Sequence, residues 1–216
     1  MKRLSDCRLY GFVDFAYLHG RATESIAQGL CDGGVDLVQL RGKSLAPEQM
    51  LAVAERIRRI TRAADVGFVV NDYPSIAVQV EADFCHLGQE DFFGAGHARV
   101  SQVIPGTSRV RLGLSTHGPA EAERAWAAGA AYLAVGPVYS TATKPTARPV
   151  TLEYVRWAAE HLTLPWFAIG GINLGNLPEV LAAGAKRICV VSALLDAPDL
   201  VKACQAFRRC LCSVPL

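Results

Sequence analysis

The 216-residue sequence has almost no excess charge and lacks apolar runs long enough to span a bilayer. Its 22 Lys and Arg residues nearly balance 20 Asp and Glu residues, for a formal net charge of +2. This balance does not favour binding to nucleic acid or to an anionic membrane. The basic start Met1-Lys2-Arg3 is not followed by the apolar segment of a signal peptide. We therefore expect a cytoplasmic protein without nucleic-acid or membrane partners, in which a few residues build any anion site locally.

Paired cysteines of the metal-binding or redox kind are also missing. The seven cysteines are scattered, no Cys-x-x-Cys occurs, and Cys210-x-Cys212 has no His or Cys cluster beside it. Cys85 and Cys189 lie in apolar runs, where a free cysteine behaves as a small hydrophobic residue. This pattern argues against a disulfide framework or a structural zinc site, and for a reducing compartment.

What the chain does have is a regular alternation of short apolar segments with segments of helical period. The predicted strands are Leu9–Val13, Val35–Leu40, Gly67–Asn71, Phe84–His86, Val110–Leu114, Tyr132–Val135, Trp166–Ile169 and Arg187–Val191. Pro47-Glu48 and Pro119-Ala120 are typical helix starts. Strands that are apolar on both faces and separated by helices imply a parallel sheet.

A weak internal repeat supports this architecture. Gly34, Gly129 and Gly184 each stand where a predicted helix ends and an apolar strand follows within a few residues. Eight such units in 216 residues predict a single (β/α)8 barrel domain over residues 1–216, of the α/β class. The alternative is an open doubly wound sheet, but no Gly-x-Gly-x-x-Gly follows the first predicted strand, so the strongest dinucleotide signature of that fold is missing.

Polar residues gather after the predicted strands, where the loops of a barrel build the active site. Gln39, Arg41 and Lys43 alternate along the second strand and its end, so one amide and two cations face the same side. Asp72 and Asp91 follow the third and fourth strands and are hard oxygen ligands of the kind that Mg²⁺ takes together with substrate phosphates. Either aspartate alone would also serve as a helix cap.

The sixth and later strands add groups suited to phosphate. Thr141, Thr143 and Lys144 follow the sixth strand and offer two hydroxyls and a mobile cation. Gly170-Gly171 and Ser192 follow the last two strands, where barrels often bind a monophosphate through backbone N–H groups. The chain thus predicts a metal–diphosphate site and a separate monophosphate site.

The histidines do not suggest covalent catalysis. We interpret His86 as an interior or orienting residue rather than a ligand, and His117 as a residue that caps a helix or lines the pocket. No Ser-His-Asp or Cys-His arrangement is compelling in the sequence.

In these motifs the sequence resembles the thiamine phosphate synthase family, which also contains the thiazole tautomerases. The matching segments run in order over most of the chain and are Val38–Lys43, Val70–Asp72, Ala82–Asp91, Gly113–His117, Val135–Lys144, Ala168–Ile172 and Val191–Ala193. The resemblance implies a transferase that joins a hydroxymethylpyrimidine diphosphate to a thiazole phosphate, or to its carboxylated precursor, and releases diphosphate. The implied partners are these small molecules; a homodimer is left open.

The resemblance also implies a role for each matched residue. The residues that hold the pyrimidine diphosphate are Gln39, Arg41, Lys43, Asn71 and Lys144, with Ser115 beside it. Asp72 and Asp91 bind Mg²⁺. The residues that hold the thiazole phosphate are Thr141, Thr143, Gly171, Val191 and Ser192. The catalytic set comprises Arg41, Lys43, Ser115 and Lys144, which act through charge and position on a dissociative reaction.

Some positions depart from the family pattern. Gly42 stands where Glu is usual, Phe84-Cys85 replaces a smaller pair, Leu9–Phe15 is a loose version of the usual opening, and the loop 145–149 lacks a common glycine. None of them removes an implied ligand.

Two other functions compete with the synthase. A thiazole tautomerase would use a histidine such as His117, and a non-catalytic sensor would keep only the pocket. The tautomerase has no need of a full diphosphate–metal set, so the residues favour the synthase.

Overall fold

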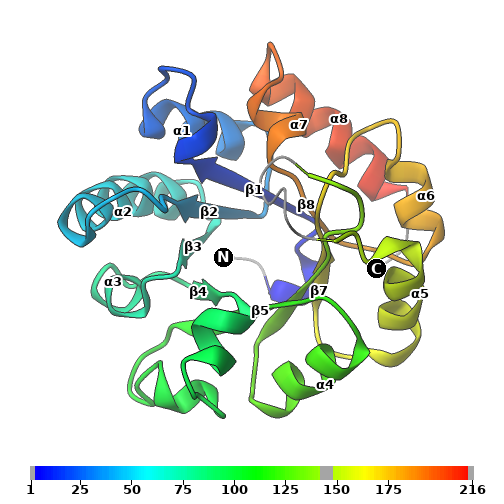
Figure 1. The fold of residues 1–216 in the computed structure, drawn as a ribbon. Coiled ribbons are helices and arrows are strands. Elements are labelled where there is room, and N and C mark those ends of the chain that lie inside the picture. Colours follow the sequence, from blue (N-terminus) through cyan, green and yellow to red (C-terminus); the bar gives the residue numbers. More distant parts are fainter. Residues whose placement is uncertain (1–2, 142–147, 214–216) are drawn as a thin grey trace.

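The computed structural model describes residues 3–141 and 148–213. Eight strands form a closed barrel in which each strand pairs in parallel with its sequence neighbours and β8 returns to β1 (Figure 1). The strands are β1 (Leu9–Asp14), β2 (Leu37–Arg41), β3 (Gly67–Asn71), β4 (Phe84–Leu87), β5 (Arg111–Thr116), β6 (Tyr132–Val135), β7 (Trp166–Ala168) and β8 (Ile188–Cys189). The predicted (β/α)8 barrel is confirmed, and the open sheet is excluded.

Helices surround the barrel (Figure 1). They are α1 (Thr23–Asp32), α2 (Pro47–Ala63), α3 (Pro74–Gln79), α4 (Pro119–Ala127), α5 (Thr151–His161), α6 (Leu177–Ala182), α7 (Ser192–Leu195) and α8 (Leu200–Cys212). The link from β4 to β5 differs, since it holds a π-helical turn η3 (Glu90–Gly94) and a 3-10 helix η4 (Val100–Gln102) in place of an α-helix. No helix in the described ranges has the length and apolarity needed to cross a membrane.

The predicted strands agree with the observed ones to within two residues at every end. The last strand is the shortest, since β8 comprises only Ile188–Cys189 of the predicted Arg187–Val191. The flanking Arg187 O still accepts from Ala168 N–H, and Val190 N–H donates to Tyr10 O, both at 3.0 Å. The predicted second strand begins at Val35, whereas β2 begins at Leu37. Both helix starts are confirmed, with Pro47 and Pro119 in the first turns of α2 and α4.

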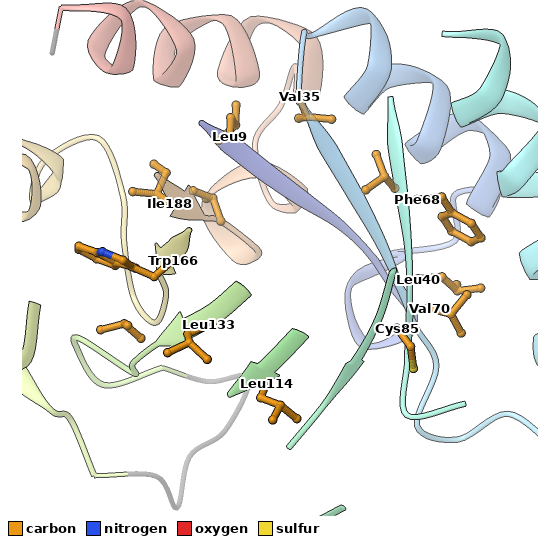
Figure 2. Close-up of a cluster of buried hydrophobic side chains, with 14 of the residues drawn as sticks. Leu9, Val35, Leu40, Phe68, Val70, Cys85, Leu114, Leu133, Trp166 and Ile188 are labelled. Carbon is orange, nitrogen blue, oxygen red and sulfur yellow. The ribbon is translucent and has the colours of Figure 1, made fainter. Parts of the chain in front are cut away.

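Side chains alternate between the two sides of the barrel wall, as the period of a strand requires. Leu9, Leu40, Phe68 and Ile188 belong to the larger cluster, between the strands and the helices (Figure 2). The inward positions form a second cluster with many aromatic rings: Tyr10, Phe12, Leu37, Val69, Phe84, Tyr132, Phe167 and Cys189. The barrel is therefore a packed core and not a pore.

The short segments around β1 complete the barrel. The 3-10 helix η1 (Leu4–Asp6) precedes β1, and its Leu4 side chain packs on the interior cluster. This contact covers the amino-terminal end of the strands. A second 3-10 helix, η2 (Phe15–Tyr17), follows β1 directly. With one end covered, the open end is the one at which the strands finish.

Candidate active site

A cavity lies at the carboxyl ends of the strands. Its lining residues come from every strand except β7 and from the segments that follow β5, β6, β7 and β8. They are Tyr10, Phe12, Gln39, Arg41, Asn71, His86, Ser115, His117, Ala134, Gly136, Pro137, Thr141, Ile169, Gly170, Gly171, Ile172, Cys189, Val191 and Ser192. This position is the one at which barrel enzymes carry their active sites.

Eight of the predicted site residues line this single cavity. They are Gln39, Arg41, Asn71, Ser115, Thr141, Gly171, Val191 and Ser192. The set draws from both predicted groups, those for the diphosphate and those for the second phosphate. Thr143 and Lys144 lie outside the described residues. The structure thus brings into one space residues that are up to 153 positions apart in the chain, from Gln39 to Ser192.

A buried ion pair holds Arg41 at the cavity wall. Its Nη1 donates to Oδ2 of Asp14 at 2.8 Å, and the two residues face each other across the β1–β2 pairing. The Asp14 side chain is only 2% exposed, and its other oxygen accepts from the backbone N–H of Ala16. Because one carboxylate fixes the guanidinium, its remaining donors are presented in a set direction. A guanidinium fixed in this way suits a phosphate group.

Asp14 was not among the residues predicted from the sequence. It directly follows the predicted apolar strand Leu9–Val13, and nothing in that pattern assigns it a role; in the structure it is the last residue of β1. Its role follows from the β1–β2 register, which sets it opposite Arg41.

Two of the inward-facing polar residues, Gln39 and His86, are held by hydrogen bonds to other side chains. Gln39, His86 and the neighbouring Asn71 are each less than 9% exposed. Gln39 donates to the hydroxyl of Tyr10 at 2.6 Å. His86 Nε2 lies 2.9 Å from Ser115 Oγ. Burying a polar group without a hydrogen-bond partner costs free energy. These hydrogen bonds therefore allow polar side chains inside the barrel near the cavity.

His86 is an interior residue, which is one of the two interpretations that the sequence allowed. Its Nδ1 lies 3.1 Å from the Tyr132 hydroxyl, and its ring stacks on that of Tyr132 at 5.6 Å between centroids. His117 lines the cavity, as predicted, and its Nδ1 lies 2.9 Å from Glu121. Sequence reasoning missed Tyr10 and Tyr132, although strand alternation was a signal that both face inward.

The loop after β6 is held against the loop after β7. Val138 N–H donates to Ile169 O at 2.8 Å, and Tyr139 N–H donates to Gly170 O at 3.0 Å. Gly170 and Gly171 have φ angles of +104° and +66°, and a Cβ at Gly170 would lie 2.4 Å from Cβ of Pro137. Both positions therefore favour glycine, because their φ angles are positive, and at Gly170 a side chain would also collide with Pro137. This contact fixes the start of the loop that leads to Thr141.

Asp72, Lys43 and Asp91 lie outside the cavity lining. Lys43 Nζ is 3.8 Å from Asp72 Oδ2, and the backbone N–H of Asp72 donates to His86 O at 3.0 Å. Neither aspartate is the helix cap that the sequence also allowed. Tyr73 stands at the N-cap of α3, and Asp91 lies within η3. The capping role that the sequence also allowed therefore does not account for either aspartate.

The two carboxylates are oxygen ligands of the kind that Mg²⁺ takes together with phosphate oxygens. They follow neighbouring strands, since Asn71 pairs with His86 across β3 and β4. Within residues 3–141 and 148–213, no group of three or more His, Cys, Asp or Glu side chains forms a protein-only metal cage. Mg²⁺ is commonly held by one or two carboxylates plus phosphate oxygens, so two aspartates are sufficient.

Cys189 lines the cavity as a buried thiol. Burial raises the pKa of its thiol well above the ordinary range, so the sulfur stays protonated near neutral pH. At His86, Nδ1 meets a phenol where a hydrolytic triad would place a carboxylate. The described part of the site thus offers neither a thiolate at Cys189 nor a carboxylate partner at His86 Nδ1.

Comparison with known proteins identifies the family of the chain. The family model for thiamine monophosphate synthase matches residues 9–194. A thiamine-phosphate synthase of Thermus thermophilus is 47% identical over 183 residues, which cover 84% of this chain and 85% of the relative. One from Lawsonia intracellularis is 37% identical and covers 95% and 93%.

A solved structure shows the same arrangement of elements. The thiamine phosphate pyrophosphorylase of Pyrococcus furiosus superposes with a TM-score of 0.86 at 31% identity, over 97% of this chain and 98% of that one. With a family model covering most of the sequence and relatives well above 30% identity, the chain belongs to the thiamine monophosphate synthase family.

Proposed function

We propose that this protein is a thiamine-phosphate synthase that joins 4-amino-2-methyl-5-hydroxymethylpyrimidine diphosphate to 4-methyl-5-(2-phosphooxyethyl)thiazole. The products are thiamine phosphate and diphosphate. The observation that supports this proposal most is the shared cavity, in which residues of both predicted substrate groups meet. The family model and the curated relatives carry the synthase name, which favours it over the tautomerase.

The reaction breaks one bond and forms one. The C–O bond between the pyrimidine methylene and the diphosphate breaks, and both electrons leave with the diphosphate. The thiazole nitrogen then donates its lone pair to the methylene cation and forms the new C–N bond. A protein nucleophile is not required, which agrees with the protonated Cys189 thiol.

The proposed role of the chain is to stabilise the leaving group and to align the partners. Arg41, held by Asp14, would bind the diphosphate, and Gln39, Asn71 and Ser115 would orient the pyrimidine side. Lys43 would join the same anion from the rim. Lys144 is assigned to the diphosphate from the family pattern alone.

The second substrate would lie against the opposite wall. Thr141, Gly171, Val191 and Ser192 line that part of the cavity and supply hydroxyl and backbone donors for the thiazole phosphate. Thr143 is assigned to this group from the family pattern alone. The thiazole nitrogen would then face the pyrimidine methylene, at the place where the C–N bond forms.

Asp72 and Asp91 would hold Mg²⁺ together with the diphosphate. The metal would supply positive charge to the leaving group and so strengthen what Arg41 and Lys43 provide.

The test is a two-substrate assay with the purified protein, run with Mg²⁺ and with a chelator. We expect thiamine phosphate and diphosphate in equal amounts with Mg²⁺, and a strong loss of both with the chelator. Tight binding of either substrate without any product would contradict the synthase and favour a sensor. Conversion of a thiazole isomer without the pyrimidine substrate would favour the tautomerase.

A further inference from the structure

A chain of hydrogen bonds crosses the barrel interior and joins two residues assigned to the pyrimidine substrate. Gln39 Nε2 donates to Tyr10 Oη at 2.6 Å, and Tyr10 Oη lies 3.0 Å from Tyr132 Oη. Tyr132 Oη lies 3.1 Å from His86 Nδ1, and His86 Nε2 lies 2.9 Å from Ser115 Oγ. The five residues come from β2, β1, β6, β4 and β5, so the chain exists only in the closed barrel.

The chain has a direction that follows from the number of protons on each member. Each phenol carries a single proton. Because Tyr10 accepts from Gln39, its own proton is directed to Tyr132, and the Tyr132 proton is directed to Nδ1 of His86. A neutral imidazole that accepts at Nδ1 carries its proton on Nε2. His86 then donates to Ser115 Oγ, and the serine proton is left for an acceptor in the cavity.

Packing holds the two phenols in place and keeps them neutral. Tyr10 is 1% exposed and Tyr132 is fully buried. Burial raises the pKa of both hydroxyls well above the ordinary range, so neither ionises near neutral pH. The Tyr132 ring packs edge-on against Phe84 and Phe167, with centroids 5.5 and 5.6 Å apart. The chain therefore has few alternative arrangements.

We propose that His86, oriented by Tyr132, is a positioning residue that makes the Ser115 hydroxyl a hydrogen-bond donor to the pyrimidine diphosphate. The identity of this acceptor rests on the proposed function, whereas the direction of the chain does not. The polarity is opposite to that of a hydrolytic triad, in which the histidine accepts the serine proton and creates a nucleophile. Here the serine keeps its proton and serves to orient and stabilise the substrate.

The first test measures which ring nitrogen of His86 carries the proton, in protein without substrate. Nitrogen-15 NMR of histidine-labelled protein distinguishes a protonated from an unprotonated ring nitrogen, and loss of one signal set in His86→Gln assigns the residue. We expect the wild-type His86 to be the Nε2–H tautomer, and Tyr132→Phe to shift it toward a mixture. Tyr154→Phe is the matched control, because it removes another buried phenol oxygen, bonded to Thr116 at 2.7 Å, outside the chain. A wild-type Nδ1–H tautomer, or equal shifts in both variants, would overturn the proposal.

The second test uses turnover. We expect Ser115→Ala and Tyr132→Phe each to lower kcat/KM by about tenfold, the upper range for one neutral hydrogen bond. If Tyr132 acts through Ser115, the double variant should be no slower than Ser115→Ala alone, and Tyr154→Phe should match the wild type. Additive losses in the double variant would refute positioning through the serine.

A conservative substitution at His86 keeps the proposal testable even if Tyr132→Phe does not fold. His86→Gln keeps a side-chain N–H near the position of Nε2, so it should retain more activity than His86→Leu; equal losses in the two variants would count against the proposal. If even the wild type forms no product, the proposed function fails, and the NMR result alone decides whether the chain has the direction inferred here.

Discussion

At the scale of single residues, the site depends on charges that the fold holds in place rather than on unusual reactivity. Arg41 and Asp14 form a pair whose side chains are 14% and 2% exposed. An exposed pair such as Arg62–Glu81, with both side chains more than half exposed, is screened by water. Breaking the buried pair leaves an uncompensated charge in the barrel, whereas breaking the exposed pair leaves two solvated ions.

Asp14→Ala is therefore expected to lower the free energy of unfolding by about 3–5 kcal/mol, because it leaves the Arg41 guanidinium without its carboxylate partner. Glu81→Ala is the control and should cost no more than about 1 kcal/mol. Urea denaturation of the two variants measures both values. Similar midpoints for the two would show that Arg41 does not depend on Asp14.

Asp72→Asn tests the metal assignment. Removing one of two proposed carboxylate ligands should lower turnover by about 100-fold and raise the Mg²⁺ concentration needed for half-maximal rate, because the metal loses a charged oxygen. Asp32→Asn, at the end of α1 and away from the cavity, is the matched control. Steady-state rates over a magnesium titration measure both effects. An unchanged magnesium dependence in Asp72→Asn would rule out this residue as a ligand.

At the scale of elements, close approach between strands decides which residues are tolerated. Gly113 on β5 pairs with Tyr132 on β6, and a Cβ at Gly113 would lie 2.1 Å from the tyrosine ring. The sequence pattern gives no reason for a glycine inside this apolar strand. The structure supplies it, because the ring that orients His86 occupies the space of the missing side chain.

Gly113→Ala should therefore destabilise the protein by about 1–3 kcal/mol through overpacking, and it should lower turnover by displacing the Tyr132 ring. Gly106→Ala is the control, since a Cβ there meets no atom within 4 Å. Thermal unfolding and the two-substrate assay test the two effects separately. Wild-type stability and rate in Gly113→Ala would mean that the interior accommodates the methyl group.

At the scale of the whole molecule, the barrel depends on contacts that join the beginning of the chain to its end. Asp36, just before β2, accepts from the backbone N–H groups of Arg8 and Leu9 at 2.8 and 3.1 Å. The same carboxylate accepts from Arg208 Nη1 of α8 at 2.7 Å. The buried Asp36 side chain thus links β1 and the start of β2 to α8 by hydrogen bonds, at the end of the barrel opposite the cavity.

Asp36→Ala should accordingly lower the free energy of unfolding by about 3–5 kcal/mol, because three donors lose a buried acceptor. The KM values of the protein that remains folded should not change, since the residue is remote from the cavity. Arg209→Ala, on the exposed side of α8, is the control. Urea denaturation and initial-rate kinetics provide the measurements. A large change in KM would show coupling between the two ends.

Much of the architecture follows from local properties of the chain. The alternation of apolar strands with helical segments, and the helix starts at Pro47 and Pro119, depend on backbone preference and burial pattern, which act over a few residues. The candidate site was predictable for the same reason. Once the strand ends are known, a barrel places the residues that follow them at one rim, and eight of the predicted residues line the cavity.

What remained for the tertiary structure were relations between residues far apart in the chain. The pairing of Asp14 with Arg41, the contact of Gly113 with Tyr132 and the hydrogen bonds from Gln39 to Ser115 all arise from strand register and barrel closure. No local pattern encodes register between strands, because it depends on the packing of the whole barrel. The sequence therefore determined the residue types and the rim to which they belong, and the closed barrel decided which of them touch.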